Sequence, residues 1–158
     1  MADEPLARED STESLHASIR RLAQLFGSRR VSANLAGVAG TDLSQQAIAM
    51  LRVLNRDGEL PIAELAQMAR MDLGAVSRQL RVMESASLVQ RKEAPSDKRV
   101  ALVRLTRSGK ALAQRIRRIE LDQLERVFTD WESTDLDHLA TLLARMVDDL
   151  AGTGFREP

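Results

Sequence analysis

The 158-residue chain contains no cysteine, and aromatic residues make up only 3% of it. Without cysteine the chain can form no disulfide, no thiolate metal site and no cysteine nucleophile, and it cannot sense oxidants through a thiol. Because aromatic residues are scarce, the core must be built from Leu, Val, Ile, Ala and Met. Hydrophobic residues account for 44% of the chain, which is enough for the core of one domain.

Long apolar runs and enzyme motifs are also missing. No segment approaches the length of a membrane span, and the acidic N-terminus has no secretory hydrophobic region, so we expect a soluble cytoplasmic protein without a membrane partner. The chain has no glycine-rich phosphate loop, nucleophile elbow or histidine-containing triad, so we predict that it is not an enzyme and needs no cofactor. His16 and His138 are isolated in the sequence, which predicts no metal site.

The whole chain has no net charge, but one segment of it is strongly basic. From Arg70 to Arg118 there are thirteen basic and four acidic residues, a net charge of +9, and the remainder carries −9. A local patch of this size attracts phosphate even though the total charge is zero. For a charge run alone, an ordinary solvated surface is as good an interpretation as a phosphate-binding one. The positions of these charges in the fold decide between the two.

The spacing of apolar residues predicts four helices, then a β-hairpin, then two further helices. This order indicates a mainly α fold with a small hairpin, the winged helix-turn-helix, flanked by N- and C-terminal dimerisation helices. The flanking helices are too long and too apolar to serve the central unit alone. We predict a disordered tail at 1–11, an N-terminal dimerisation helix at 12–40, a winged helix-turn-helix lobe at 41–110, C-terminal dimerisation helices at 111–152 and a tail at 153–158.

The fourth predicted helix, which Asp72 caps, combines an apolar stripe with a basic face. At about 100° per residue, the stripe of Leu73, Val76, Leu80 and Met83 lies opposite Arg78. Arginine forms two-point contacts with guanine or phosphate, and small neighbours allow close approach. A solvated helix face is the alternative. The predicted DNA contacts of this helix are Ala75, Ser77, Arg78, Gln79 and Arg81.

The tip of the predicted hairpin is the second basic site. Residues 88–91 and 100–105 are expected to form its strands, and the turn between them places Asp97, Lys98 and Arg99 at the tip. A cation on such a wing can reach the minor groove of DNA. Asp97 would hold Arg99 in place or cap the turn. The alternative interpretation is an ordinary polar turn.

Four segments together resemble the signature of the MarR family of bacterial transcriptional regulators: Ala75-Val76-Ser77-Arg78-Gln79-Leu80, Leu88-Val89-Gln90-Arg91, Asp97-Lys98-Arg99 and Leu105-Thr106-Arg107-Ser108-Gly109. The resemblance implies a homodimer on a pseudo-palindromic operator in double-stranded DNA. It also implies DNA contacts by Ser77, Arg78 and Arg99, with Asp97 orienting Arg99. One departure is Ser87, which stands where the family usually has glycine and which predicts a strained helix end or a different exit.

Many relatives respond to small aromatic molecules bound between the dimerisation helices and the DNA-binding lobe. By position, the resemblance suggests His16, Arg20, Met50 and Trp131 as lining residues of an effector site. A structural role is the better interpretation for each of them: Met50 is better explained as a core residue, and Trp131 as an anchor of a helix junction or dimer. We therefore expect a sequence-specific DNA-binding regulator, a repressor released by a small ligand. The alternative is a winged-helix protein-interaction module without specific DNA binding.

Overall fold

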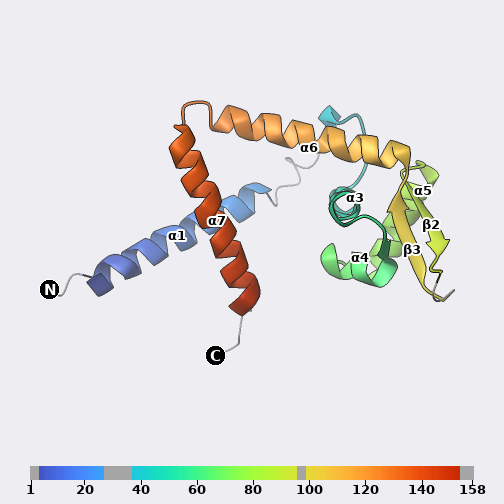
Figure 1. Cartoon of the computed structure of the whole chain (residues 1–158), viewed down its shortest axis with the longest axis horizontal. Coiled ribbons are helices and arrows are strands. Elements are labelled where there is room, and N and C mark those ends of the chain that lie inside the picture. Colours follow the sequence, from blue (N-terminus) through green and yellow to red (C-terminus); the bar gives the residue numbers. More distant parts are fainter. Residues whose placement is uncertain (1–3, 27–36, 96–98, 154–158) are drawn as a thin grey trace. The chain divides into compact units, whose positions relative to one another are not determined.

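The computed structural model describes residues 4–26, 37–95 and 99–153 (Figure 1). Contacts within the chain divide it into two units, Met1–Ile119 and Glu120–Pro158, and α6 continues from the first into the second. The elements are α1 (Glu4–Phe26), α3 (Gln45–Asp57), β1 (Leu60–Pro61), α4 (Ile62–Met68), α5 (Leu73–Ser85), β2 (Val89–Glu93), β3 (Ala101–Leu105), α6 (Arg107–Val127) and α7 (Ser133–Thr153).

Side-chain caps define where the central helices begin. The Ser44 hydroxyl accepts a hydrogen bond from the Ala47 backbone N–H at 3.1 Å and caps α3. The Asp72 carboxylate accepts one from the Ala75 N–H at 2.7 Å and caps α5. These bonds satisfy backbone donors that the first helical turn leaves unpaired. The predicted cap of α5 is therefore confirmed.

The hairpin is present, and it belongs to a sheet with one more strand than we predicted. The strand order is β1-β3-β2, with both pairs antiparallel. Val89 pairs with Leu105 in the hairpin, and the added strand pairs Leu60 with Val103. β1 has only two residues and ends in proline, so it gave no alternating pattern. This short strand joins the loop before α4 to the wing.

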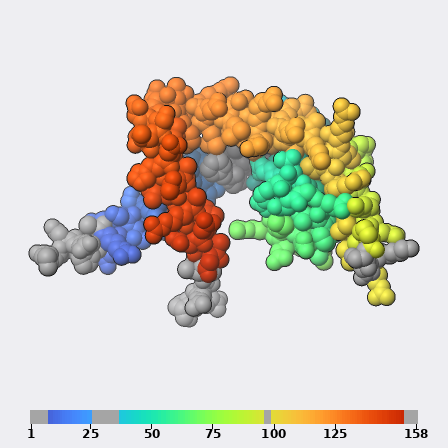
Figure 2. All heavy atoms as spheres, in the orientation of Figure 1, coloured from blue at the N-terminus to red at the C-terminus, as the bar shows by residue number. Residues whose placement is uncertain are grey.

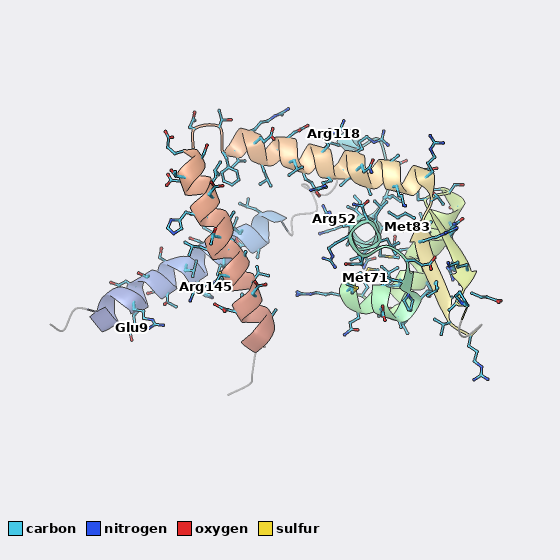
Figure 3. All side chains as sticks on the ribbon, viewed as in Figure 1. Glu9, Arg52, Met71, Met83, Arg118 and Arg145 are labelled. Atoms are coloured by element: carbon cyan, nitrogen blue, oxygen red, sulfur yellow. The ribbon has the colours of Figure 1, made fainter. Side chains whose placement is uncertain are left out.

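In the described part of the chain, the core lies within the first unit, among α3, α4, α5, the sheet and the first part of α6. Met83 is completely buried there (Figure 3), and the atoms of α3 and α4 pack against those of the hairpin (Figure 2). Val76 and Leu80 are also inaccessible, as the predicted stripe of α5 requires. Leu73 was wrongly included in that stripe: its side chain is 56% exposed, because it lies in the first turn of α5, beyond the core.

A close junction joins the end of α5 to the start of α6. Ser87 has a φ of 57°, so the strained helix end expected from the absence of glycine is confirmed. The Thr106 hydroxyl donates to the Ser87 carbonyl at 2.7 Å and accepts from the Gly109 N–H at 3.0 Å. Any Cβ at Gly109 would collide with the Leu88 carbonyl oxygen, so only glycine fits. The Leu-Thr-x-x-Gly segment thus fastens α6 to the exit of α5.

The outer helices differ from the prediction at their ends and expose apolar side chains. α1 begins at Glu4, so the expected tail at 1–11 is wrong from that residue onward; a single proline near a helix start does not prevent helix formation. α1 ends at Phe26, and 27–36, which we had assigned to the same helix, lie outside the described residues. No helix in the described ranges is both long and apolar enough to span a membrane. The exposed apolar residues include Leu15, Ile19, Leu22 and Leu25 of α1, Leu121, Leu124 and Val127 of α6, and Leu142, Leu143, Val147 and Leu150 of α7.

Candidate nucleic-acid interface

The outward face of α5 carries two exposed arginines beside a glycine. Arg78 and Arg81 are both exposed, and neither forms an ion pair with an acid in the described part of the chain. The Arg78 guanidinium extends along the helix toward Gly74, where an added Cβ would lie 3.5 Å from Nη1. This distance is an ordinary van der Waals contact, so the Arg78 side chain lies directly against the helix surface at Gly74. The arrangement presents two planar, permanently charged groups to solvent.

Ala75 does not belong to this face. It is only 4% exposed and forms part of the buried side of α5, and its N–H is used by the Asp72 cap. The buried arc of the helix is shifted toward Ala75 and away from Leu73, so the helical-wheel prediction was wrong at both positions. Ala75 therefore presents almost no exposed side-chain surface for the predicted contact with DNA.

Gln79 is engaged within the protein. Its side-chain oxygen accepts a hydrogen bond from the Ser44 hydroxyl at 2.7 Å, and its Nε2 donates to Gln46 Oε1 at 3.4 Å. Gln79 and Ser77 are both half-buried. Because Ser44 is also the cap of α3, Gln79 links α5 directly to the start of α3. This link fixes the position of α5 and was not visible in the sequence, where the partners are 35 residues apart.

Two cations of the hairpin are neutralised by acids of neighbouring elements. Arg91 Nε lies 2.6 Å from Glu84 Oε1 of α5, and Lys92 Nζ lies 2.9 Å from Glu59 Oε1 beside β1. These pairs attach the wing to the elements on either side of it. The net charge of +9 already counts Glu84, but Glu59 lies outside residues 70–118, so its pairing with Lys92 lowers the local charge by one, to +8.

The predicted wing-tip contacts are only partly described. Arg99 is exposed at the start of the β3 side of the hairpin, whereas Asp97 and Lys98 lie outside the described residues. The proposed orientation of Arg99 by Asp97 stays a prediction.

Elsewhere in the lobe, a hydrogen bond and ion pair with Arg56 at 2.8 Å lower the pKa of the Asp57 carboxyl at the end of α3.

The four residues suggested for an effector site have different environments. His16 and Arg20 are exposed on α1, whereas Met50 is completely buried in the core of the lobe. Trp131 is 48% exposed and packs edge-to-face on Phe128, with ring centroids 5.1 Å apart. Burial favours the core interpretation of Met50, and the ring contact favours the helix-junction interpretation of Trp131. In the described ranges, no cluster of three or more His, Asp or Glu residues could hold a metal ion.

Comparison with known proteins agrees with this geometry. A sequence model of the MarR family matches residues 43–101, which include α5 and most of the wing. The "Uncharacterized HTH-type transcriptional regulator YxaD" of Bacillus subtilis (strain 168) is 30% identical over 128 residues, covering 81% of this chain and 84% of that protein.

Two solved structures share the fold. Streptococcus pneumoniae FabT, crystallised in complex with DNA, has a TM-score of 0.68 at 16% identity and covers 92% of this chain and 98% of its own. A MarR family transcriptional regulator from Silicibacter pomeroyi has a TM-score of 0.66 at 24% identity, with 89% and 92% covered. At these identities, the likeness establishes the winged helix fold and no more.

Proposed function

The chain belongs to the MarR family of transcriptional regulators, which bind DNA and are not enzymes, and we propose that it binds a specific duplex sequence as a homodimer. The observation that carries this proposal is the exposed pair Arg78 and Arg81 on α5, a helix held in place by the Asp72 cap and the Gln79–Ser44 hydrogen bond. A helix of this kind fits the major groove, where arginine distinguishes guanine by O6 and N7.

The residues predicted to contact DNA have different proposed roles. We assign base or phosphate contact to Arg78 and Arg81, and phosphate contact to the half-buried hydroxyl of Ser77. Gln79 is a positioning residue, because its side-chain oxygen is already bonded to Ser44. Arg99, with Lys98 beside it and Asp97 orienting it, would enter the minor groove from the wing.

The dimer is supported by the apolar side chains that α1, the end of α6 and α7 leave exposed in a single chain. Burying them between two subunits would remove large apolar areas from water. Two α5 helices related by a twofold axis would read a pseudo-palindromic operator with half-sites about 34 Å apart, one turn of DNA. We propose repression by operator occupancy, with release by a small aromatic effector; the effector rests on the family resemblance.

Selection of bound sequences from a random duplex pool tests the proposal directly. We expect one enriched, pseudo-palindromic sequence, bound with an affinity that falls steeply as salt rises. Arg78→Ala should cost about 1–3 kcal/mol and relax the preference at one position of each half-site. Arg145→Ala, which removes an exposed arginine from α7, is the matched control and should leave affinity unchanged.

One outcome would contradict the proposal, and a second would decide between the two roles proposed for Arg78. Recovery of no enriched sequence, together with salt-independent binding, would favour the protein-interaction alternative. Equal loss from Arg78→Ala on every sequence would make Arg78 a phosphate contact and transfer specificity to other residues. For the effector, aromatic acids added to the operator complex should raise its Kd, and no change across a panel of them would remove that part of the proposal.

A further inference from the structure

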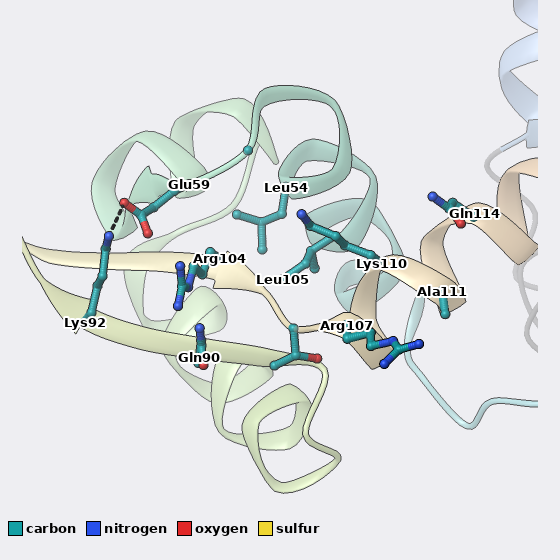
Figure 4. A pocket seen from close by; sticks show the side chains of 12 residues that line it. Leu54, Glu59, Gln90, Lys92, Arg104, Leu105, Arg107, Lys110, Ala111 and Gln114 are labelled. Carbon is teal, nitrogen blue, oxygen red and sulfur yellow. Dashed lines mark ion pairs between the residues drawn. The ribbon is translucent and has the colours of Figure 1, made fainter.

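A groove of about 910 Å³ lies on the wing and the start of α6 (Figure 4). Its walls include Gln90 and Arg104, which pair across β2 and β3, and Lys110 from the first turn of α6. These strand positions are on the sheet face opposite Val103, which is buried in the core. The groove is therefore a separate surface from the exposed arginines of α5.

The groove is strongly positive. Its lining contains four cations, Lys92, Arg104, Arg107 and Lys110, and one carboxylate, Glu59, giving a net charge of +3. Glu59 is already bound to Lys92 at 2.9 Å. No acid in the described part of the chain pairs with the remaining three cations. A concave surface with one sign of charge concentrates ions of the other sign.

Two of these cations occupy an unfavourable place in their helix. Arg107 and Lys110 lie in the first turn of α6, and that turn contains no acid. The N-terminal end of a helix carries partial positive charge and is stabilised by acids, so cations there reduce stability. Local rules of this kind are broken mainly where a function requires it. An anion in the groove would compensate both the helix end and the side chains.

We propose that this groove binds a small molecule that carries phosphate groups. In Figure 4, Lys110 extends over Leu105 toward the sheet, and Arg104 lies between Lys110 and Lys92, so the three cationic groups line one continuous concavity. Leu54 and Leu105 supply its apolar floor. Guanidinium and ammonium groups form charge-assisted hydrogen bonds with phosphate oxygens, and the volume is in the range of small-molecule sites.

The groove suits a small ligand better than the backbone of the operator. Arg99 lies in the turn before β3, near the wing tip, whereas Arg104 lies near the other end of β3, roughly 10 Å along the strand from Ala101, where β3 begins. A wing inserted by its tip leaves the base away from the duplex. A rigid, convex duplex is also a poor match for a concavity lined on two sides by β2, β3 and α6.

The test is a titration of the full chain, without DNA, with inorganic pyrophosphate at constant ionic strength. Amide resonances of residues 104–110 should shift and saturate. Arg104→Gln/Lys110→Gln should raise the Kd at least about tenfold, because it removes two charge-assisted contacts. Arg115→Gln/Arg118→Gln makes the same charge change at exposed positions farther along α6 and should leave the Kd within about twofold.

Three results would overturn the proposal. Shifts that never saturate, or equal weakening by both double variants, would mean an adventitious ion only. A loss of operator affinity in Arg104→Gln/Lys110→Gln as large as that of Arg78→Ala would make the groove a DNA-phosphate contact. Because Arg104 lies within β3, Lys110→Gln alone is the second variant: removing a cation from a helix N-terminus should leave the Tm unchanged or higher, and the Kd for pyrophosphate should still rise. Because the titration contains no DNA, its outcome is independent of the proposed DNA binding.

Discussion

The central lobe buries most of its large apolar side chains, whereas the outer helices leave many of theirs exposed. Among the residues that the structure describes, every member of the hydrophobic core lies between Ala39 and Ile116, whereas α7 buries none of its large apolar side chains. Both regions have helices with well-separated apolar and polar faces in sequence. The lobe completes its core within one chain, whereas the outer helices leave apolar side chains exposed. The same kind of sequence pattern thus builds a core in the first region and an exposed apolar face in the second, where we propose that two subunits associate.

The largest expected effect tests the self-sufficiency of the lobe. Leu80→Ala removes a completely buried side chain from α5 and should lower the free energy of unfolding by about 2–5 kcal/mol. Leu73→Ala, on the same helix but 56% exposed, is the control and should change it by less than about 0.5 kcal/mol. Urea unfolding monitored by circular dichroism measures both. Similar losses in the two variants would mean that the buried face of α5 has been wrongly placed.

The next effect concerns association. Leu143→Ala on α7 removes an exposed apolar side chain from each subunit, so the dimer Kd should rise roughly 100-fold if each loss is worth about 1.4 kcal/mol. Sedimentation over a concentration series measures this, and the unfolding of the lobe should not change. Arg145→Ala, on the opposite side of α7, should leave the Kd as it is. An unchanged Kd in both variants would mean that Leu143 is not at the interface.

The smallest effect should be a gain that is confined to the lobe. Ser87 has a φ of 57°, which glycine adopts without strain, so Ser87→Gly should stabilise the chain by about 1 kcal/mol. Ser85→Gly, inside the last turn of α5, should instead destabilise it by about 0.5–1 kcal/mol. Thermal unfolding distinguishes them by the sign of the shift in Tm. A loss in Ser87→Gly would show that the serine side chain makes a compensating contact.

Local signals in the sequence were sufficient for much of the fold. Asp72 was identified as a cap because a short polar side chain before an apolar repeat satisfies free backbone donors. The hairpin followed from a turn cluster between two short apolar runs. β1 was missed because its two residues are a strand only through pairing with β3, a contact that no local pattern encodes.

The candidate site was predicted less completely. Arg78 and Arg81 were placed correctly because helical periodicity determines the exposed face when the buried face is known. Ala75 was misplaced because alanine fits either face, and its burial depends on the neighbouring helices. Gln79 had the chemistry of a base contact, but its hydrogen bond to Ser44 depends on the packing of α3 against α5. Long-range contacts of this kind come only from the fold.

The close junction that Thr106 and Gly109 form between α5 and α6 limits how α6 can move. The Thr106 hydroxyl bonds to the Ser87 carbonyl after α5 and to the Gly109 N–H in the first turn of α6, and Gly109 lies against the Leu88 carbonyl. The start of α6 is therefore held directly against the residues that follow α5. α6 has 21 residues and is about 31 Å long, so a tilt of about 5° at this junction moves its far end by roughly 3 Å. The fixed end of α6 lies beside α5, the helix that we propose contacts DNA. A displacement of a few ångströms at the far end of α6 would therefore correspond to a rotation of only a few degrees next to α5.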